Sequence, residues 1–193
     1  IHPDTFPMDL IDLVAENKKI LPYFDIPVQH ADREVLKAMR RSGDGEKYGE
    51  LFRKIREKNP DAVIRTTLML GFPGEDRAAF EKLLDFVKTS QPDWMGSFTY
   101  SREEDTPAYS MRNQKDHDKA QRTAKKWQKE LEEAQSPITE KRLEKFVGNT
   151  YRALIEEKIE GEDLAIGRIY YQAPDVDGLT VIMGRDLNPG DTV

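Results

Sequence analysis

Hydrophobic positions over the first 115 residues alternate between the spacing of a helix and that of a buried strand. The three strand-like runs are residues 23–28, 62–70 and 94–100. Apolar residues at steps of three and four predict helices before and between them, with these apolar faces: Phe6, Leu10, Leu13, Val14; Val35, Leu36, Met39; Tyr48, Leu51, Phe52, Ile55; and Phe80, Leu83, Leu84, Val87. This alternation favours parallel strands joined by right-handed helical crossovers.

Capping and helix-breaking residues agree with these boundaries. Asp4 or Thr5 can cap the first helix and Asp32 the second, and Pro60 stops the third. A complete open sheet or barrel carries more than three strands, and here no strand precedes the first helix. We therefore expect residues 1–115 to be the C-terminal part of an α/β domain whose N-terminal part is absent.

A long helical pattern follows over residues 116–142. Its apolar positions recur at alternating steps of four and three: Ala120, Ala124, Trp127, Leu131, Ala134 and Ile138. The spacing predicts one amphipathic helix, bent at Pro137, that connects two domains and packs across the first. A coiled-coil dimer is the alternative interpretation of the same apolar stripe.

After about residue 143 the helical spacing is replaced by short alternating runs. Residues 150–159, 164–171 and 179–184 are separated by the turn segments "EGED" and "PDVDG", and "NPGD" follows the last run. This pattern predicts a small antiparallel barrel or sandwich over residues 143–193. The final turn should lead into another strand, so we expect this domain to be incomplete as well.

Composition narrows the possible functions. The 193 residues include no cysteine, which excludes disulfides, thiolate catalysis and cysteine-bound clusters within this chain. No apolar run approaches 18 residues and no signal peptide opens the chain, so we expect a cytoplasmic protein without a membrane span. The formal net charge is −6. That charge does not suit a general phosphate-backbone binder, although a local basic patch stays possible.

The segment "TTLMLGFPGED" is the first candidate for chemistry. Gly71 to Glu75 follow a buried strand, at the end where ligands bind in open α/β sheets and barrels. Glycine lets the backbone approach a ligand, Pro73 stiffens the turn, and acids suit the start of the next helix. An ordinary strand–turn–helix connection would explain the same residues. No Gly-Lys-Ser/Thr follows, so the segment is not a phosphate loop.

Two further groups of polar residues follow the other strands. Gln29 and His30 end the first strand and can bind a polar ligand, although a lone histidine also suits a structural role. Neither His2 nor His117 has ligand-like spacing to His30, so we expect no metal site. The acids of residues 100–109 can do acid/base work or form a solvated loop.

Three stretches together resemble one family. They are "YFDIPVQHADREVLKAMRR", "IRTTLMLGFPGED" and "MGSFTYSREEDTPAY", and the tail adds "FVGNTYRALIEEKIEG" and "IGRIYYQAPDVDG". The first three resemble the radical S-adenosylmethionine methylthiotransferases, and the tail resembles the small, OB-like TRAM β-barrel that ends those enzymes. The resemblance implies the C-terminal half of a radical-SAM partial TIM barrel, a connecting helix and an incomplete TRAM domain.

The family's branches differ in substrate. The tRNA-modifying branch typically has Gln-Ser at Gln29-His30 and a Pro-Arg-Pro-Gly-Thr type loop at residues 102–106. This chain is instead similar to the branch that methylthiolates the β-carbon of an aspartate in small-subunit ribosomal protein twelve. Residues 173–178 also resemble that branch. One departure is Asp105, where the family usually has glycine, and it leaves the conformation of that loop open.

The resemblance also implies cofactors, a partner and site residues. S-adenosylmethionine would be bound by Gln29, His30, Met69, Gly71, Phe72, Pro73, Gly74 and Glu75. The substrate would meet Tyr100, Glu103, Glu104, Asp175 and Asp177. The intact enzyme would carry two 4Fe-4S clusters, both held by cysteines upstream of this chain, so these residues alone should be inactive. No catalytic residue is assigned.

The charge of the tail fits a basic protein substrate. From Glu140 onward there are seven basic and eleven acidic residues, a surplus that would attract a ribosomal protein and repel tRNA. We expect the intact enzyme to be a monomer. The alternatives are a tRNA methylthiotransferase of the same family and a binding module that kept the scaffold without clusters.

Overall fold

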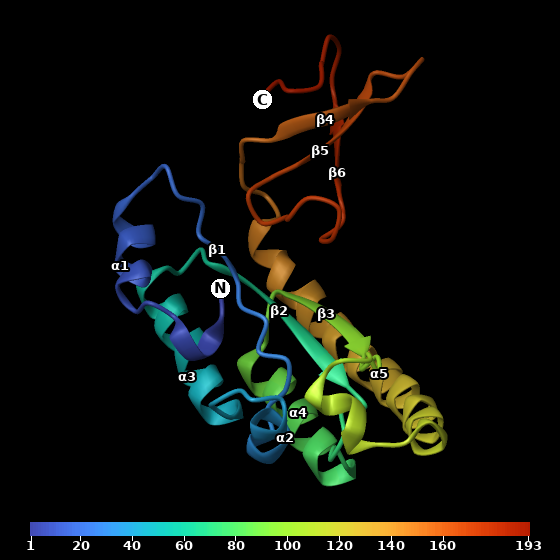
Figure 1. The fold of residues 1–193 in the computed structure, drawn as a ribbon. Coiled ribbons are helices and arrows are strands. Elements are labelled where there is room, and N and C mark those ends of the chain that lie inside the picture. Colours follow the sequence, from blue (N-terminus) through green and yellow to red (C-terminus); the bar gives the residue numbers. More distant parts are fainter.

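The computed structural model describes residues 1–193 as two lobes, each built on a three-stranded sheet (Figure 1). The first sheet is parallel in the order β1-β2-β3, and the second is antiparallel in the order β4-β5-β6. The strands are β1 (Tyr23–Asp25), β2 (Val63–Leu70), β3 (Trp94–Thr99), β4 (Leu154–Lys158), β5 (Leu164–Arg168) and β6 (Thr180–Met183). Every strand lies within a run that the hydrophobic pattern predicted, so both sheets are confirmed.

Helices connect the strands of the parallel sheet and then lead to the second lobe. They are α1 (Asp9–Glu16), α2 (Arg33–Ala38), α3 (Gly45–Lys58), α4 (Arg77–Ser90) and α5 (Gln114–Leu143), with short 3₁₀ turns at Pro3–Thr5, Pro107–Met111 and Glu144–Phe146. Asp32, Asp44 and Asp76 cap α2, α3 and α4 by accepting backbone N–H bonds of 2.8–3.0 Å. These caps explain why each helix begins where it does.

The start of the first helix differs from the prediction. Asp4 and Thr5 belong to the turn Pro3–Thr5, and α1 begins only at Asp9. The reason is Pro7, which disfavours helical backbone at the residue before it. Phe6 is accordingly extended, with φ −65° and ψ 120°.

Strand β2 divides its side chains between two faces. Ile64, Leu68 and Leu70 are fully buried in a core formed with the helices. Because successive side chains of a strand alternate, Arg65 and Met69 lie on the opposite face and are only half-buried. This second face is the one on which a ligand can reach the sheet.

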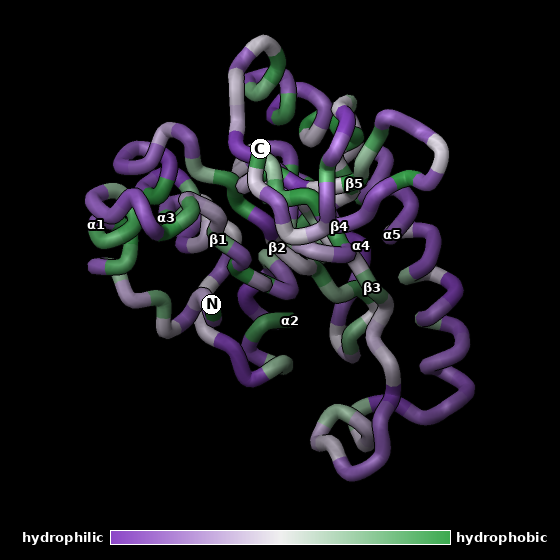
Figure 2. The backbone as a smooth tube through the Cα atoms, turned by 90° about the horizontal axis from the view of Figure 1, so that it is seen from above, coloured by the Kyte–Doolittle hydropathy of each residue, from purple (hydrophilic) through white to green (hydrophobic).

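Helix α5 packs along the first lobe and uses its apolar stripe within the chain. Ala124 and Leu131 are fully buried, and the ring of Trp127 stacks on Phe80 of α4 at 5.0 Å between centroids. The remaining surface of α5 is mostly hydrophilic (Figure 2). The predicted packing across the first domain is therefore confirmed, and the stripe is not left over for a coiled coil.

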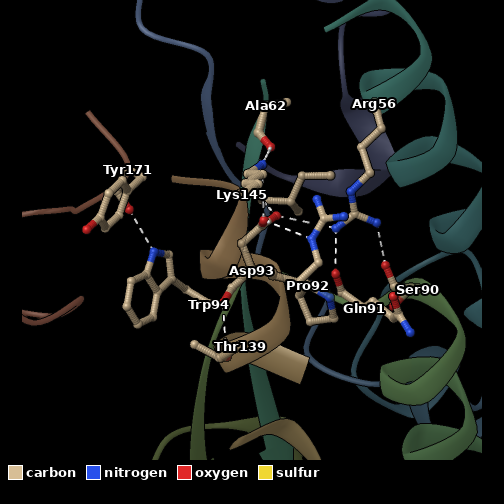
Figure 3. A network of polar contacts seen from close by, with 12 residues as sticks. Arg56, Ala62, Ser90, Gln91, Pro92, Asp93, Trp94, Thr139, Lys145 and Tyr171 are labelled. Carbon is tan, nitrogen blue, oxygen red and sulfur yellow. Dashed lines mark hydrogen bonds and ion pairs between the residues drawn. The ribbon is translucent and has the colours of Figure 1, made fainter. Parts of the chain in front are cut away.

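Asp93 binds basic side chains of three elements near the place where the two lobes meet: α3, α5 and the 3₁₀ turn Glu144–Phe146. Its carboxylate is fully buried and lies 3.0 Å from Arg142, 3.4 Å from Arg56 and 3.5 Å from Lys145. It also accepts the backbone N–H of Ile64 at 2.9 Å. Figure 3 shows Arg56 and Lys145 approaching Asp93 from different elements. Burial lowers the pKa of Lys145, although Asp93 opposes that shift.

The second lobe docks on the end of the first sheet where its strands begin. The indole of Trp94 donates to the carbonyl of Tyr171 at 2.7 Å, and the hydroxyl of Tyr170 donates to the carbonyl of Asp61 at 3.1 Å. Asp177 reaches across to Arg65. The lobe therefore lies opposite the strand ends at which the candidate site was predicted.

The second lobe is an antiparallel sheet without barrel closure. Its three strands pair as adjacent neighbours, and one further bridge joins Leu154 to Thr192. A bulge between Ile155 and Glu157 shifts the register of β4. No helix of the chain is both long and apolar enough to cross a membrane.

Candidate cofactor pocket

The loop after β2 is shaped by two glycines in the left-handed region. Gly71 has φ +81° and Gly74 has φ +97°, conformations that other residues adopt only with strain. The loop ends at Asp76, which caps α4 by accepting the N–H of Ala79 at 2.8 Å. The glycines thus let the chain turn sharply from a buried strand into a helix.

A closed polar network holds this loop against the end of β1. The Nε2 atom of His30 lies 3.1 Å from Oε1 of Glu75, and both side chains are fully buried. The other oxygen of Glu75 accepts the backbone N–H of Gly71. The Nδ1 atom of His30 accepts the N–H of Asp32 at 2.9 Å, so the ring proton must lie on Nε2. His30 therefore donates to Glu75.

Gly71 is needed for packing within the chain. A Cβ at this position would lie 2.8 Å from the Cβ of Ala124 on α5. The guanidinium of Arg112 also donates to the carbonyls of Gly71 and Phe72, at 2.9 and 3.3 Å. The close approach that glycine permits here is therefore to helix α5. The approach of a ligand to the backbone of Gly71, which the sequence suggested, stays a prediction, since Gly71 also lines a cavity beside α5.

A cavity of about 360 Å³ lies at the carboxyl ends of the strands, on the side of Met69. Gln29 and Phe72 also line it, together with Met39 and Met111. Gln29 adopts a left-handed backbone, with φ +69°, and its side-chain oxygen is buried with no hydrogen-bond partner. A buried acceptor without a donor is costly, so this oxygen would gain a hydrogen bond if the Gln29 side chain turned toward an N–H or O–H group of a ligand in the cavity.

The structure divides the predicted cofactor residues among different places. Gln29, Met69 and Phe72 line the 360 Å³ cavity, whereas Gly71 and Glu75 line a separate cavity of about 240 Å³ beside α5. The remaining three lie in neither cavity: His30 and Pro73 are buried, and Gly74 is exposed. The predicted set is therefore not one continuous surface.

The loop after β3 separates its predicted substrate residues. Tyr100 points inward, with its ring 5.0 Å from that of Phe72, while Glu103 and Glu104 are exposed. The guanidinium of Arg102 covers the ring of Tyr109 at 3.5 Å. Asp105 has φ +63°, the left-handed conformation that a glycine would take at the same place. The departure from the family pattern is therefore accommodated without a change of backbone region.

The two tail acids have different environments. Asp175 is exposed, as a recruiting residue requires. Asp177 is only 3% exposed, accepts from Ala173 N–H at 2.9 Å, and pairs with Arg65 at 3.3 Å and with the hydroxyl of Tyr23. Burial and this hydrogen bond raise the pKa of Tyr23 well above its ordinary range. The carboxylate of Asp177 already binds the first lobe, and contact of Asp177 with the substrate stays a prediction.

Sequence reasoning missed two residues that the structure brings to the strand ends. Arg112 fastens the loop at Gly71, and Arg40 lines the 360 Å³ cavity. Nothing in the local pattern marked Arg112. Arg40 follows the end of α2, where a left-handed residue is common, but the pattern could not show which cavity it would border.

Comparison with known proteins adds family information. The profile described as the Radical SAM superfamily matches residues 1–87, and the TRAM domain profile matches residues 147–193. A structure of coproporphyrinogen III oxidase (HemN) from Escherichia coli, described as a radical SAM enzyme, is similar with a TM-score of 0.50 and 24% identity. That match covers 60% of this chain and 26% of the other, and it concerns the fold alone.

Curated relatives align with nearly the whole chain. The protein named ribosomal protein uS12 methylthiotransferase RimO is 42% identical in Treponema denticola, over 99% of this chain and 42% of its own. Proteins of the same name are 41% identical in Alkaliphilus oremlandii and 40% identical in Thermotoga maritima, each over 96% of this chain. They are matched over 41% and 42% of their own lengths. The chain thus spans about two fifths of the length of these relatives.

Proposed function

Because this chain belongs to the radical SAM methylthiotransferase family, we propose that the intact protein adds a methylthio group to the β-carbon of an aspartate in small-subunit ribosomal protein twelve. One observation carries the proposal: identity of 40–42% over nearly the whole chain to relatives named for that substrate. The order of lobes agrees with it, since a parallel α/β part precedes an antiparallel β part.

The 360 Å³ cavity supports binding of S-adenosylmethionine. Met69 and Phe72 offer apolar walls against which an adenine ring can pack, and Gln29 can turn its unpaired side-chain oxygen to accept from an N–H or O–H of the cofactor. His30 and Glu75 contribute indirectly, because the hydrogen bond between them fixes the end of β1 against the loop after β2. The fit therefore rests chiefly on Gln29, Met69 and Phe72.

In this reaction the residues of the chain bind the cofactor and keep it in position. When bound in the intact enzyme, S-adenosylmethionine and the clusters supply hydrogen abstraction from the substrate carbon and the transferred sulfur. The chain contains no cysteine, so cluster thiolates have to come from outside it. Gln29, Met69 and Phe72 hold the cofactor, and the Arg112 and Glu75 contacts keep the loop at Gly71 in place.

Exposed acids support recruitment of a basic protein substrate. Glu103 and Glu104 lie on the loop beyond β3, and Asp175 lies on the tail. Negative groups at these places raise the rate of encounter with a positively charged ribosomal protein. We accordingly propose a cytoplasmic enzyme that acts as a monomer on this protein.

Mass spectrometry of the substrate tests the activity. The intact enzyme is produced in a host whose own gene for this modification is deleted, and both ribosomal protein twelve and total tRNA are analysed. We expect a methylthio group on one aspartate of the protein and no new methylthioadenosine in tRNA. Modification of tRNA with an unmodified protein would replace our substrate assignment by the other branch of the family.

Calorimetric binding of S-adenosylmethionine to the intact protein tests the cavity. Gln29→Ala should weaken binding by about tenfold, because a cofactor donor loses its acceptor. Gln91→Ala is the matched control, since Gln91 is also left-handed, with φ +47°, but ends α4 outside the cavity. Equal affinity of the Gln29 variant and the wild type would remove Gln29 from the site.

A further inference from the structure

The C-terminal end of α2 is closed by an arginine where glycine is usual. Arg40 follows the cap residue Met39 and has φ +59°. The backbone N–H groups of Arg40 and Arg41 donate to Lys37 and Leu36 at 3.0 and 2.8 Å, which ends the helix. A left-handed residue at this point favours glycine, because a side chain adds strain. Glycine would avoid this strain, and the chain instead has a long cationic side chain at this position.

Arg40 lines the same cavity as Gln29 and Met69. Arg40 is exposed, and its guanidinium makes neither a hydrogen bond nor an ion pair within the chain. The neighbouring Arg41 also lines the cavity but is half-buried and donates to the carbonyl of Pro27 at 3.2 Å. Arg40 thus keeps all of its donors free at the mouth of the cavity.

No acidic residue lines this cavity, whose only charged residues are Arg40 and Arg41. The planar donors of a guanidinium match the two oxygens of a carboxylate, and no neighbouring acid occupies those of Arg40. The charge and shape of the mouth therefore fit a ligand that is apolar at one end and carries a carboxylate at the other.

We infer that Arg40 binds a carboxylate group at the mouth of this cavity, and we assign that carboxylate to the aspartate side chain of the protein substrate. The inference rests on the proposed function and adds a specificity residue to it. In this chain Arg40 is exposed, Met69 is half-buried and Phe72 is buried, so we place the cofactor against Met69 and Phe72 and the substrate at Arg40. The carboxylate of S-adenosylmethionine shares the same chemistry and is the other possible source.

Replacement of Arg40 by glycine distinguishes an effect on ligand affinity from an effect on the stability of the fold. Arg40→Gly removes the guanidinium and also relieves the positive φ, so we expect a thermal midpoint equal to or above that of the wild type. Arg40→Lys keeps the charge but loses the paired donors. The matched control is Lys37→Gln, which removes a positive charge from an exposed site on the same helix, outside the cavity.

Binding to the intact protein is measured with two pairs of probes. One pair is a substrate peptide with the target aspartate and the same peptide with asparagine; the other is S-adenosylmethionine and its decarboxylated form. For Arg40→Gly we expect about 10- to 100-fold weaker binding of the aspartate peptide, with binding of the asparagine peptide unchanged. Arg40→Lys should lose less, and Lys37→Gln should match the wild type.

Three outcomes would overturn the inference. Unchanged affinity of Arg40→Gly for all probes would show that Arg40 binds no carboxylate. Weaker binding of S-adenosylmethionine, but not of its decarboxylated form, would move the carboxylate to the cofactor. Equal losses for both peptides would show that Arg40 does not read the carboxylate. If the wild type binds neither peptide nor S-adenosylmethionine, the proposed function fails first, and the two failures are thereby distinguished.

Discussion

At the scale of single residues, the strand ends are held together by buried polar side chains whose hydrogen bonds are made within the chain. Glu75 uses one oxygen for His30 and the other for Gly71, and neither His30 nor Glu75 is exposed. A carboxylate removed from water is tolerated only when both oxygens find donors. Glu75 therefore acts as a brace between the end of β1 and the loop after β2.

Glu75→Gln should destabilise the fold by about 1–3 kcal/mol, because the amide N–H₂ would face the donor of His30 or of Gly71. Urea unfolding of the variant measures the change. Glu81→Gln is the control, since Glu81 is exposed and pairs only with Arg77 on its own helix. Equal stability of the two variants would show that the brace contributes nothing.

The carboxylate of Asp32 caps α2, and its protonation makes the stability of the fold depend on pH. Burial raises the pKa of its carboxyl, but hydrogen bonds from Lys82 and from the backbone of Val35 outweigh burial and hold the pKa below the ordinary value of 3.8. A lowered acid pKa stabilises the fold above the unfolded value, and that stability is lost as pH falls through the folded value. Asp32→Asn should therefore differ from the wild type by a constant amount above about pH 5.

The difference between wild type and Asp32→Asn should shrink as pH falls below about 4. Thermal unfolding at a series of pH values measures it. A difference that is the same at pH 3 and pH 7, or that grows in acid, would contradict the lowered pKa. Asn keeps an acceptor for the cap, so the variant isolates the effect of the charge.

At the scale of elements, helix α5 packs its apolar stripe against the first lobe and forms one side of it. Its buried alanine meets Gly71, and its glutamines Gln128 and Gln135 donate to the carbonyls of Ser97 and Pro92 at 3.0 and 2.8 Å. These contacts hold α5 against β3 and the segment before it. Small residues at the crossing are what allow the helix to come this close.

Gly71→Ala should destabilise the fold by about 1–3 kcal/mol, since the new methyl group meets Ala124 and the positive φ is strained. Adding Ala124→Gly should recover part of that loss by removing the contact, although the strain stays. A double-mutant cycle by chemical denaturation measures the coupling. Strict additivity of the two changes would show that the crossing is not tight.

At the scale of the whole molecule, two buried carboxylates connect the lobes. Asp93 gathers Arg142 and Lys145 from the connecting segment, and Asp177 binds Arg65 and Tyr23 on the sheet. The contacts of Asp93 fix the position of the segment that follows α5. The contacts of Asp177 fix the orientation of the β lobe on the first sheet. Neither carboxylate lines the 360 Å³ cavity, so the orientation of the tail can be altered without touching that cavity.

Asp177→Asn should loosen the β lobe from the sheet. The amide cannot replace a carboxylate that serves Arg65, Tyr23 and the N–H of Ala173 together, so proteolysis within residues 147–153 should become faster by about tenfold. Asp175→Asn is the control, because Asp175 is exposed two residues away. Equal cleavage of both variants would mean that Asp177 does not hold the lobes together.

Hydrophobic spacing alone determined the two kinds of sheet, the helical crossovers and the long helix, because the side-chain period of a strand or helix is a local property. The cap Asp32 was equally readable, since capping depends on neighbours in sequence. The start of α1 was placed too early, because the pattern gave too little weight to Pro7.

Only the tertiary structure decided what the candidate residues do. Gly71 stood in a loop typical of ligand binding, but its near neighbour is Ala124, 53 positions later in the numbering. Asp177 stood among solvated acids, yet it binds Arg65 at a separation of 112 residues. The sequence did not distinguish Arg40 from the other basic residues, and only the fold places it at the same cavity as Gln29. Contacts over such separations depend on how the elements pack, which no local pattern encodes.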